Sequence, residues 1–403
     1  MPHRDRSLPT AMVNARGRAR IASGHPWVYR QDVLSGPATD AGNDGPALVA
    51  VVDERRRPLA VATWAVLSPI ALRIFERRTQ IESLPTLLAL VSDRIEAAVA
   101  WRLDLAMDRD AFRVVHGEAD ALPGLVVDRY ADAAVIQTTS VAMDAIKPAL
   151  AAWLRERLDV RIVVARDDGS ARDFEGLPRS REVIAGHGAT EVVYRLGPNR
   201  LQADLLTDSK TGGFLDQADN HAAVAARTPL GSRCLDAFTY HGGFALALAQ
   251  RNGPVLATDQ ETQAVARAKA NAERNHLVNL EVRQADAFDL LRTLEADKRH
   301  FDVVVLDPPA LAKRQGGDHA ALRAYQELIL RGLRLTKPGG MAVVCSCSGR
   351  VSREQFDELV AAAGTQSGRP VQILERRGAG RDHPELAGVP ETGHLKCWIL
   401  RVL

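Results

Sequence analysis

The second half of the chain alternates regularly between short apolar runs and amphipathic segments, and this alternation limits the folds that are open to it. The apolar runs lie at 233–238, 255–259, 301–306 and 340–346, and segments with helical periodicity separate them. Such alternation is typical of a parallel sheet with helices on both faces. The run at 301–306 is apolar almost throughout, as expected for a strand buried on both sides. We therefore predict a Rossmann-like α/β domain over residues 191–403.

The first 190 residues follow a different pattern. Residues 1–78 lack long helical periodicity and contain short strand-like runs, two of them around the turn Arg55-Arg56-Arg57-Pro58, which predicts a small β-rich domain. Residues 79–190 begin with a long amphipathic segment and continue through strands and a second helix, which predicts a central α+β domain. At 403 residues the chain is too long for one hydrophobic core, so three domains fit its length.

Composition narrows the class of protein. Hydrophobic residues make up 46% and charged residues 25%, which is ordinary for a globular protein. No window resembles a membrane-spanning helix, and the N-terminal stretch lacks the apolar core of a secretory signal. We therefore expect a cytoplasmic protein with reduced thiols. Its four cysteines show no C-x-x-C spacing, which argues against a zinc site.

Arginines gather near the N-terminus although the formal net charge is only +2. One group lies within residues 1–30, and a second comprises Arg55, Arg56, Arg57, Arg73, Arg77 and Arg78. Basic patches of this kind suit phosphate backbones, so we expect residues 1–78 to contact nucleic acid through its phosphates. The alternative is a chain-wide preference for arginine over lysine.

Acidic residues follow four successive strands of the predicted sheet, where ligands bind in folds of this kind. They are Asp236 with the later glycine pair Gly242-Gly243, Asp259, Asp286, and Asp307 with Pro308-Pro309. Asp259 is placed to accept hydrogen bonds from ribose hydroxyls, and Asp286 from an exocyclic amine. Each acid alone could be a helix cap or lie in a solvated turn, but acids at the ends of four successive strands favour a nucleoside cofactor. The G-x-G-x-x-G fingerprint of dinucleotide sites is absent, so S-adenosylmethionine fits best.

Two cysteines, Cys345 and Cys347, stand at the end of the strand in "GGMAVVCSCSG". Side chains alternate along a strand, so both would point to the same side, and two such cysteines cannot easily bridge. Core packing, metal ligation and a nucleophilic role are the three explanations that the strand alone leaves open.

Several motifs together resemble one known family. They are "SKTGGFLDQADN" at 209–220, "AFTYHGGF" at 237–244, "DPPALAK" at 307–313, "CSCSG" at 345–349 and "DHPELAGVPETGHLK" at 382–396, with "GHPWVY" and "HGEADALPGLVVDRY" earlier in the chain. The chain is similar over essentially its whole length to the bacterial 23S ribosomal RNA cytosine-carbon-5 methyltransferases. It departs from the family pattern at Ala218, His241 and Leu311.

This resemblance implies an N-terminal PUA domain, a central α+β domain and a C-terminal class I methyltransferase domain. It also implies S-adenosylmethionine as cofactor, large-subunit ribosomal RNA as partner, and a homodimer. The cofactor contacts that we expect are Lys210, Phe214, Asp216, Gln217, Asp236, Phe238, Tyr240, Gly242, Gly243, Asp259, Asp286, Ala287 and Asp307.

The resemblance also selects among the explanations for the cysteines. Methylation of carbon 5 of cytosine needs covalent attack on carbon 6, which is a task for a thiolate. Cys347 matches the nucleophile of the family motif, and Asp307 is expected to hydrogen-bond the base. Arg350, Lys313 or the cofactor's sulfonium could favour the thiolate. We expect the other three cysteines to lie in the core.

Three other functions remain to be weighed. An amino-group methyltransferase favours an aromatic residue after the D-P-P sequence, where this chain has Ala310, and would leave the thiol without a role. A non-catalytic RNA-binding protein would have little reason to keep the acids and Cys347. A nicotinamide oxidoreductase is disfavoured by the missing glycine fingerprint.

Overall fold

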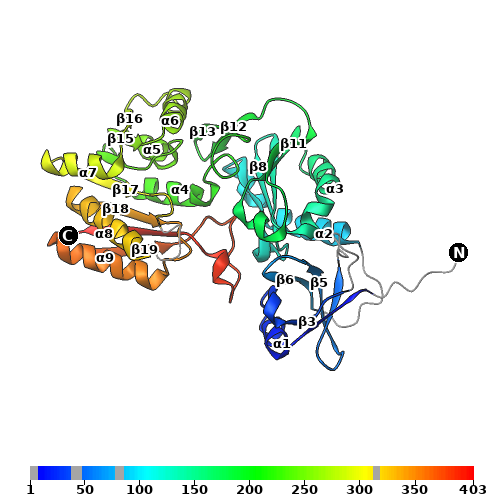
Figure 1. Ribbon diagram of the computed structural model, residues 1–403. Coiled ribbons are helices and arrows are strands. Elements are labelled where there is room, and N and C mark those ends of the chain that lie inside the picture. The colour runs from blue at the N-terminus through cyan, green and yellow to red at the C-terminus, as the bar shows by residue number, and fades with distance from the viewer. Residues whose placement is uncertain (1–7, 38–47, 78–85, 312–317) are drawn as a thin grey trace. The chain divides into compact units, whose positions relative to one another are not determined.

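The computed structural model describes residues 8–37, 48–77, 86–311 and 318–403 (Figure 1). These residues form two compact units. The first comprises the described residues of 1–192 together with 204–212 and 384–392, and the second comprises 193–203, 213–383 and 393–403. The predicted boundary at residue 78 lies outside the described residues, so the division into three domains stays a prediction.

The N-terminal sheet of the first unit has six strands in the order β2-β6-β5-β4-β1-β3. Its strands are β1 (Thr10–Val13), β2 (Trp27–Tyr29), β3 (Val33–Ser35), β4 (Val49–Val52), β5 (Pro58–Trp64) and β6 (Ile70–Glu76), and helix α1 (Ala15–Ala22) follows β1. Asn14 caps α1 by accepting a hydrogen bond from the Gly17 amide at 3.0 Å. The turn between β4 and β5 closes on Asp53, whose Oδ1 accepts from the Arg55 and Arg57 amides at 2.9 Å each. These strands confirm the predicted β-rich segment.

The second sheet of the first unit has five strands in the order β11-β10-β9-β8-β7. They are β7 (Ala111–His116), β8 (Leu125–Tyr130), β9 (Ala133–Thr138), β10 (Ile162–Asp167) and β11 (Ser180–Gly186), and the helices are α2 (Leu87–Trp101) and α3 (Val141–Arg157). Leu87, Val91, Ile95 and Ala98 form a buried stripe along α2, at the three- and four-residue spacing seen in the sequence.

One arginine of the predicted basic cluster is not available to a ligand. Arg73 is 6% exposed, and its Nη2 lies 2.8 Å from Oε1 of the buried Glu175. A buried charge needs a partner, and this pair joins strand β6 to the 3-10 turn Ser170–Glu175. Arg55, Arg56, Arg57 and Arg77 are exposed, while Arg78 lies outside the described residues.

The second unit contains a sheet of seven strands in the order β16-β15-β14-β17-β18-β20-β19 (Figure 1). Its strands are β14 (Cys234–Asp236), β15 (Val255–Asp259), β16 (Leu280–Gln284), β17 (Phe301–Leu306), β18 (Thr336–Ser346), β19 (Val371–Arg377) and β20 (Lys396–Val402). Strands β14 to β18 are parallel, and β20 runs antiparallel between β18 and β19. A separate two-stranded sheet pairs β12 (Glu191–Leu196) with β13 (Asn199–Asp204).

Helices cover both faces of the seven-stranded sheet, as predicted. They are α4 (Ala218–Arg227), α5 (Gly243–Ala249), α6 (Thr262–Arg274), α7 (Ala287–Ala296), α8 (Asp318–Leu335) and α9 (Arg353–Ser367). Val304 and Leu306 of β17 belong to the core that includes residues of α7, α8 and α9, whereas Val303 and Val305 belong to the core with residues of α4, α5 and α6. The continuous apolar run of β17 therefore reflects burial on both sides.

Within the described ranges, every helix is too short or too polar to cross a membrane.

Candidate active site

The predicted site residues gather at one edge of the seven-stranded sheet. Strands β15, β14, β17 and β18 are neighbours and run parallel, so their carboxyl ends meet at the same edge. Asp259 and Asp236 are the last residues of β15 and β14, while Asp307 and Cys347 directly follow β17 and β18. The order of strands thus places three acids and one thiol side by side along the ligand-binding edge.

Asp236 is the most deeply buried acid of this edge, with no exposed surface. Its Oδ2 accepts hydrogen bonds from the Thr239 hydroxyl at 2.8 Å and from the Ala245 amide at 3.1 Å. Its Oδ1 is buried and has no hydrogen-bond partner among the described residues. Burial raises the pKa of Asp236 to about 7, because the charged form is poorly solvated there. This carboxyl group therefore has an acceptor available for a ligand or water.

The turn after β14 adopts backbone conformations that bring it close to Asp259. Tyr240 has φ +48° and Gly242 has φ +94°, and the left-handed region suits glycine far better than tyrosine. The Tyr240 amide donates to Asp259 Oδ2 at 2.9 Å, and the Glu261 amide donates to Oδ1 at 3.0 Å. Each carboxylate oxygen can accept more than one hydrogen bond, so Asp259 keeps acceptor capacity for ribose hydroxyls.

Aromatic rings surround this turn. The Phe214 and Tyr240 rings meet edge to face with their centroids 4.9 Å apart. The rings of Tyr240 and His241 stack at 3.7 Å with an interplanar angle of 11°. Burial lowers the pKa of His241 to about 3, so the ring is neutral at physiological pH. Phe238 is half-buried and packs against the hydrophobic core.

Asp307 receives a hydrogen bond from a residue of the "SKTGGFLDQ" motif. Gln217 Nε2 donates to Asp307 Oδ2 at 3.0 Å. The amide oxygen of Gln217 accepts from Asn220 Nδ2 at 2.6 Å, and Asn220 also donates to the Gly378 carbonyl at 3.0 Å. This chain of hydrogen bonds fixes which end of the Gln217 amide faces Asp307. Asp216, the residue before Gln217, is buried. Its backbone carbonyl oxygen accepts a hydrogen bond from the Gly380 amide at 2.8 Å.

Three other predicted cofactor contacts have less support from the geometry. Asp286 is exposed and caps α7, where its Oδ1 accepts from the Asp289 amide at 3.1 Å, and Ala287 is the buried first residue of that helix. Lys210 is an exposed residue of the first unit with φ +53°. Their roles toward the cofactor stay predictions.

The four cysteines differ sharply in their surroundings, and no disulfide bond joins any of them. Cys234, Cys345 and Cys397 are at most 1% exposed and share one hydrophobic core cluster, as expected. Burial raises the pKa of the Cys234 thiol to about 12 and that of Cys345 well above its ordinary value. Cys347, by contrast, is partly exposed at the end of β18. The structure thus distinguishes one accessible thiol from three core cysteines.

Sequence reasoning missed a polar group around Cys347. Ser346 Oγ donates to the phenol oxygen of the buried Tyr325 at 3.1 Å and accepts from the Ser348 amide at 3.3 Å. Lys396, the first residue of β20, is 2% exposed and donates to the carbonyls that follow Cys347. Nothing in the sequence near Tyr325 or Lys396 indicates a role at the site. The pattern around Tyr325 predicts a core position of a helix, and the pattern around Lys396 predicts the polar start of a strand. Lys313 lies outside the described residues.

Parts of the chain match two known protein families. A family described as a methyltransferase domain matches residues 230–378, and a PUA-like domain family matches residues 12–77. The "Ribosomal RNA large subunit methyltransferase" of Deinococcus radiodurans is 34% identical over 408 residues, which cover 97% of this chain and 96% of that protein. The "Ribosomal RNA large subunit methyltransferase I" of Cronobacter sakazakii is 31% identical over 406 residues, which cover 98% and 100%. The chain belongs to the ribosomal RNA large subunit methyltransferase family.

Solved structures agree with this assignment at the level of the fold. A putative methyltransferase crystallised with SAH has a TM-score of 0.81 at 16% identity, with 98% of this chain and 100% of that chain covered. A putative SAM-dependent methyltransferase from Streptococcus mutans has a TM-score of 0.80 at 16% identity and the same coverage. Membership in the ribosomal RNA large subunit methyltransferase family confirms the predicted PUA-like N-terminal segment, the Rossmann-like domain and the expectation of S-adenosylmethionine as methyl donor.

The residues at the sheet edge fit that cofactor. Asp236 offers a buried acceptor oxygen, and Asp259 offers a half-buried carboxylate. A Cβ added at Gly242 would lie 3.3 Å from Leu246 Cγ, so glycine allows the turn to pack tightly against α5. No arrangement of three or more His, Cys, Asp or Glu side chains in the described ranges could hold a metal ion.

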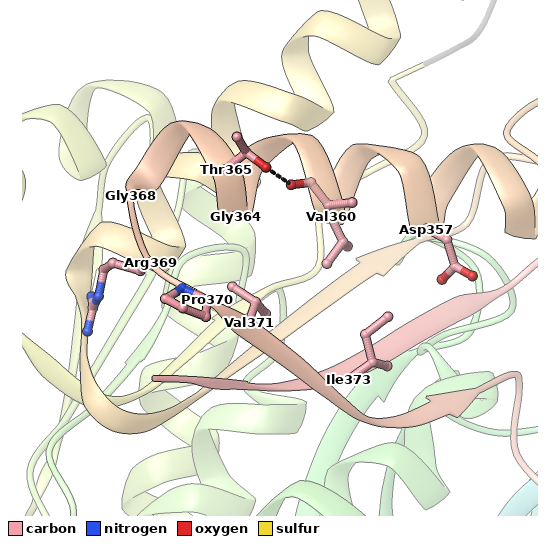
Figure 2. A pocket seen from close by; sticks show the side chains of 10 residues that line it. Asp357, Val360, Gly364, Thr365, Gly368, Arg369, Pro370, Val371 and Ile373 are labelled. Atoms are coloured by element: carbon pink, nitrogen blue, oxygen red, sulfur yellow. Dashed lines mark hydrogen bonds between the residues drawn. The ribbon is translucent and has the colours of Figure 1, made fainter.

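The second unit also contains a hollow that lies away from the predicted site. It has a volume of about 390 Å³ and lies between α9 and the start of β19, where Val360, Val371 and Ile373 line it (Figure 2). Val371 pairs with Val402, the last residue of β20, whereas the predicted site lies at the edge where β20 begins. The hollow is therefore at the opposite edge of the sheet from Cys347 and the acids.

Proposed function

We propose that this chain forms 5-methylcytosine in large-subunit ribosomal RNA, with Cys347 as the nucleophile. The observation that carries the proposal is the position of Cys347, a partly exposed thiol that directly follows β18. The neighbouring parallel strand is β17, which Asp307 directly follows. A thiol in the ligand-binding edge has no task in amino-group methylation, whereas methylation of carbon 5 requires one. The names of the relatives support ribosomal RNA of the large subunit as the substrate.

The chemistry follows from the low reactivity of carbon 5. The Cys347 thiolate adds to carbon 6 of cytosine, so that an S–C6 bond forms and the electrons of the C5–C6 double bond make carbon 5 nucleophilic. Carbon 5 would then take the methyl group of bound S-adenosylmethionine, whose bond between the sulfonium sulfur and the methyl carbon breaks and leaves S-adenosylhomocysteine. A base removes the proton from carbon 5, the S–C6 bond breaks, and the double bond and the thiolate are restored. The net result exchanges one hydrogen of the ring for a methyl group.

Asp307 is assigned to the pyrimidine edge. A carboxyl group there can hydrogen-bond nitrogen 3 or the amino group of cytosine and offset the charge that develops on the ring during attack. Gln217 orients this carboxyl group, because its Nε2 donates a hydrogen bond to Asp307 Oδ2. The candidates for the final proton transfer are Asp382, His383 and Glu391 of the late motif. Asp382 and His383 form a buried pair, with His383 Nδ1 2.9 Å from Asp382 Oδ1, whereas Glu391 is exposed.

The N-terminal arginines are assigned to the RNA backbone. Arg55, Arg56 and Arg57 occupy an exposed turn between β4 and β5, and Arg77 is exposed after β6. Arginines on turns suit phosphate contacts, which position an RNA without reading its sequence. The homodimer implied by the resemblance stays a prediction.

A labelled-methyl assay tests the product. Tritiated S-adenosylmethionine and protein-free large-subunit RNA should give label in 5-methylcytosine after digestion to nucleosides. RNA with 5-fluorocytosine at the target should trap a covalent adduct, because fluorine cannot leave as a proton does. The adduct should survive denaturation and map to the peptide that contains Cys347. Label in N-methylated bases, or an adduct on another residue, would contradict the proposal.

A further inference from the structure

A buried lysine lies next to the proposed nucleophile. Lys396 is 2% exposed, and its Nζ donates hydrogen bonds to the Ser348 carbonyl at 2.6 Å and to the Val351 carbonyl at 2.7 Å. Lysines are almost never buried to this extent without a compensating partner. Among the described residues, no carboxylate pairs with this ammonium; its hydrogen bonds go to backbone oxygens. Such a costly position calls for an explanation beyond packing.

The sheet topology places this lysine beside Cys347. Strand β20 runs antiparallel to β18, so it begins at the edge where the parallel strands end. Lys396 pairs with Ser346, the residue directly before Cys347. The two carbonyls that accept from Nζ belong to the turn 348–351, which starts immediately after the thiol. The ammonium therefore closes this turn from the neighbouring strand.

We propose that Lys396 is a positioning residue for Cys347: it holds the turn that follows the thiol and places a buried positive charge beside the thiolate. The inference rests on the proposed nucleophilic role of Cys347. Removing the ammonium would take its hydrogen bond from the Val351 carbonyl and would leave the Ser348 carbonyl with the longer bond from the Val351 amide, at 3.3 Å. It would also deprive the thiolate of a compensating cation.

The electrostatics around the thiol support this role. Burial lowers the pKa of Lys396 to about 8, while the charge on Cys347 acts in the opposite direction. A thiolate that stabilises the ammonium is stabilised by it in turn, because the interaction is mutual. At neutral pH the lysine is thus still largely protonated, and loses its charge as the pH rises through about 8.

Other titratable and charged groups lie near Lys396 and Cys347. The pKa of Tyr325 on α8 is raised mainly by burial and further by the charges on Cys347 and Asp307, so both of these lie close to the phenol. Arg353, at the start of α9, lowers the pKa of Lys396 through charge repulsion. The negative charge on Asp307 disfavours a thiolate nearby. Lys396 offsets that effect from β20.

Alkylation of Cys347 as a function of pH tests the inference without turnover. The full-length protein is treated with iodoacetamide, and modification of the Cys347 peptide is followed by mass spectrometry; the three other thiols are buried and serve as internal references. In the wild type we expect a Cys347 thiol pKa below the ordinary value of about 8.5. In Lys396→Met we expect the pKa to rise and alkylation at pH 7 to slow by about tenfold, since one pKa unit is a factor of ten. Lys396→Arg should retain the low pKa.

Arg401→Met is the matched control, because it removes an exposed cation from the other end of the same strand. Its alkylation profile should equal that of the wild type. An unshifted thiol pKa in a folded Lys396→Met protein would overturn the inference, as would a wild-type thiol pKa at or above 8.5. If Lys396→Met does not fold, a raised pKa in Lys396→Arg would likewise overturn it. Failure of the proposed function has a separate signature, which is full methylation activity in Cys347→Ser.

Discussion

Gln217 donates a hydrogen bond to Asp307 at 3.0 Å across 90 positions of the sequence. The same side chain interacts with the thiol of Cys345, the core cysteine of β18. One glutamine thus connects the segment before the first parallel strand to the ends of β17 and β18. The acid that we assign to the cytosine edge is held by a residue that sequence reasoning placed at the cofactor.

This relationship predicts the effect of removing the glutamine amide. Gln217→Leu takes a hydrogen bond from a charged acceptor, which is worth about 1.5–3 kcal/mol. We expect kcat to fall by about 10- to 100-fold, since each 1.4 kcal/mol is a factor of ten. Single-turnover kinetics with labelled methyl donor would measure this. Gln372→Leu, at an exposed position of β19, should leave kcat unchanged, and equal rates for both variants would show that Asp307 does not need Gln217.

Cys347→Ser and Cys345→Ser should separate chemistry from stability. A serine at 347 is close in size but far less nucleophilic, so turnover should disappear while S-adenosylmethionine and RNA binding persist. A serine at 345 places a hydroxyl in an apolar core, so the free energy of unfolding should fall by about 1–3 kcal/mol with the reaction retained. Denaturant titration and methylation assays on both variants measure these effects. Activity in Cys347→Ser would remove the basis for the covalent mechanism.

The cofactor assignment predicts a loss of affinity when Asp259 is truncated. Asp259→Ala removes the carboxylate that holds the Tyr240 amide and that we assign to the ribose. We expect S-adenosylmethionine to bind about 10- to 100-fold more weakly by calorimetry, as for the loss of hydrogen bonds to a charged group. Asp297→Ala, at the exposed end of α7, is the control. Unchanged affinity in both Asp259→Ala and Asp216→Ala would show that the assigned cofactor contacts are wrong.

Asp236 should make the stability of the cofactor-free protein depend on pH. Burial raises its pKa to about 7 from 3.8, so between these values the folded state binds a proton that the unfolded state has released. Wild-type stability should therefore fall, relative to Asp236→Asn, as the pH rises from about 4 to about 7, by about 4 kcal/mol at most. Urea titrations of both proteins at several pH values measure the difference. A difference that does not change with pH would mean that Asp236 ionises normally.

The exposed arginines in the turn between β4 and β5 predict a change in the salt dependence of RNA binding. Replacing Arg55 and Arg56 by alanine should weaken binding and reduce the slope of log K against log salt by about 0.7 for each single-stranded phosphate contact that is lost. Affinity for S-adenosylmethionine should stay the same. Arg299→Ala, an exposed arginine of the second unit, serves as the control. An unchanged slope in the double variant would assign RNA binding to another surface.

The order of elements and the identity of the edge residues could be predicted from the sequence. The apolar runs and the amphipathic segments between them predict the alternation of strands and helices, because the spacing of apolar residues within a segment indicates which structure can bury them. In a parallel sheet the carboxyl ends of the strands share one edge, so the positions of Asp236, Asp259, Asp307 and Cys347 followed from the pattern. The core positions of Cys234 and Cys345 followed from the same apolar runs, and that of Cys397 followed from the C-terminal apolar run "KCWILRV" at 396–402.

Only the tertiary structure decided which distant side chains meet these residues. Lys396 lies beside Cys347 because β20 enters the sheet antiparallel between β18 and β19, and no local period encodes that insertion. Gln217 reaches Asp307, and Arg73 turns from the predicted RNA surface to the buried Glu175, for the same kind of reason. Hydrogen bonds and ion pairs of long side chains depend on where separate elements pack, and that packing is a property of the whole chain, whereas hydrophobic periodicity is a property of each segment.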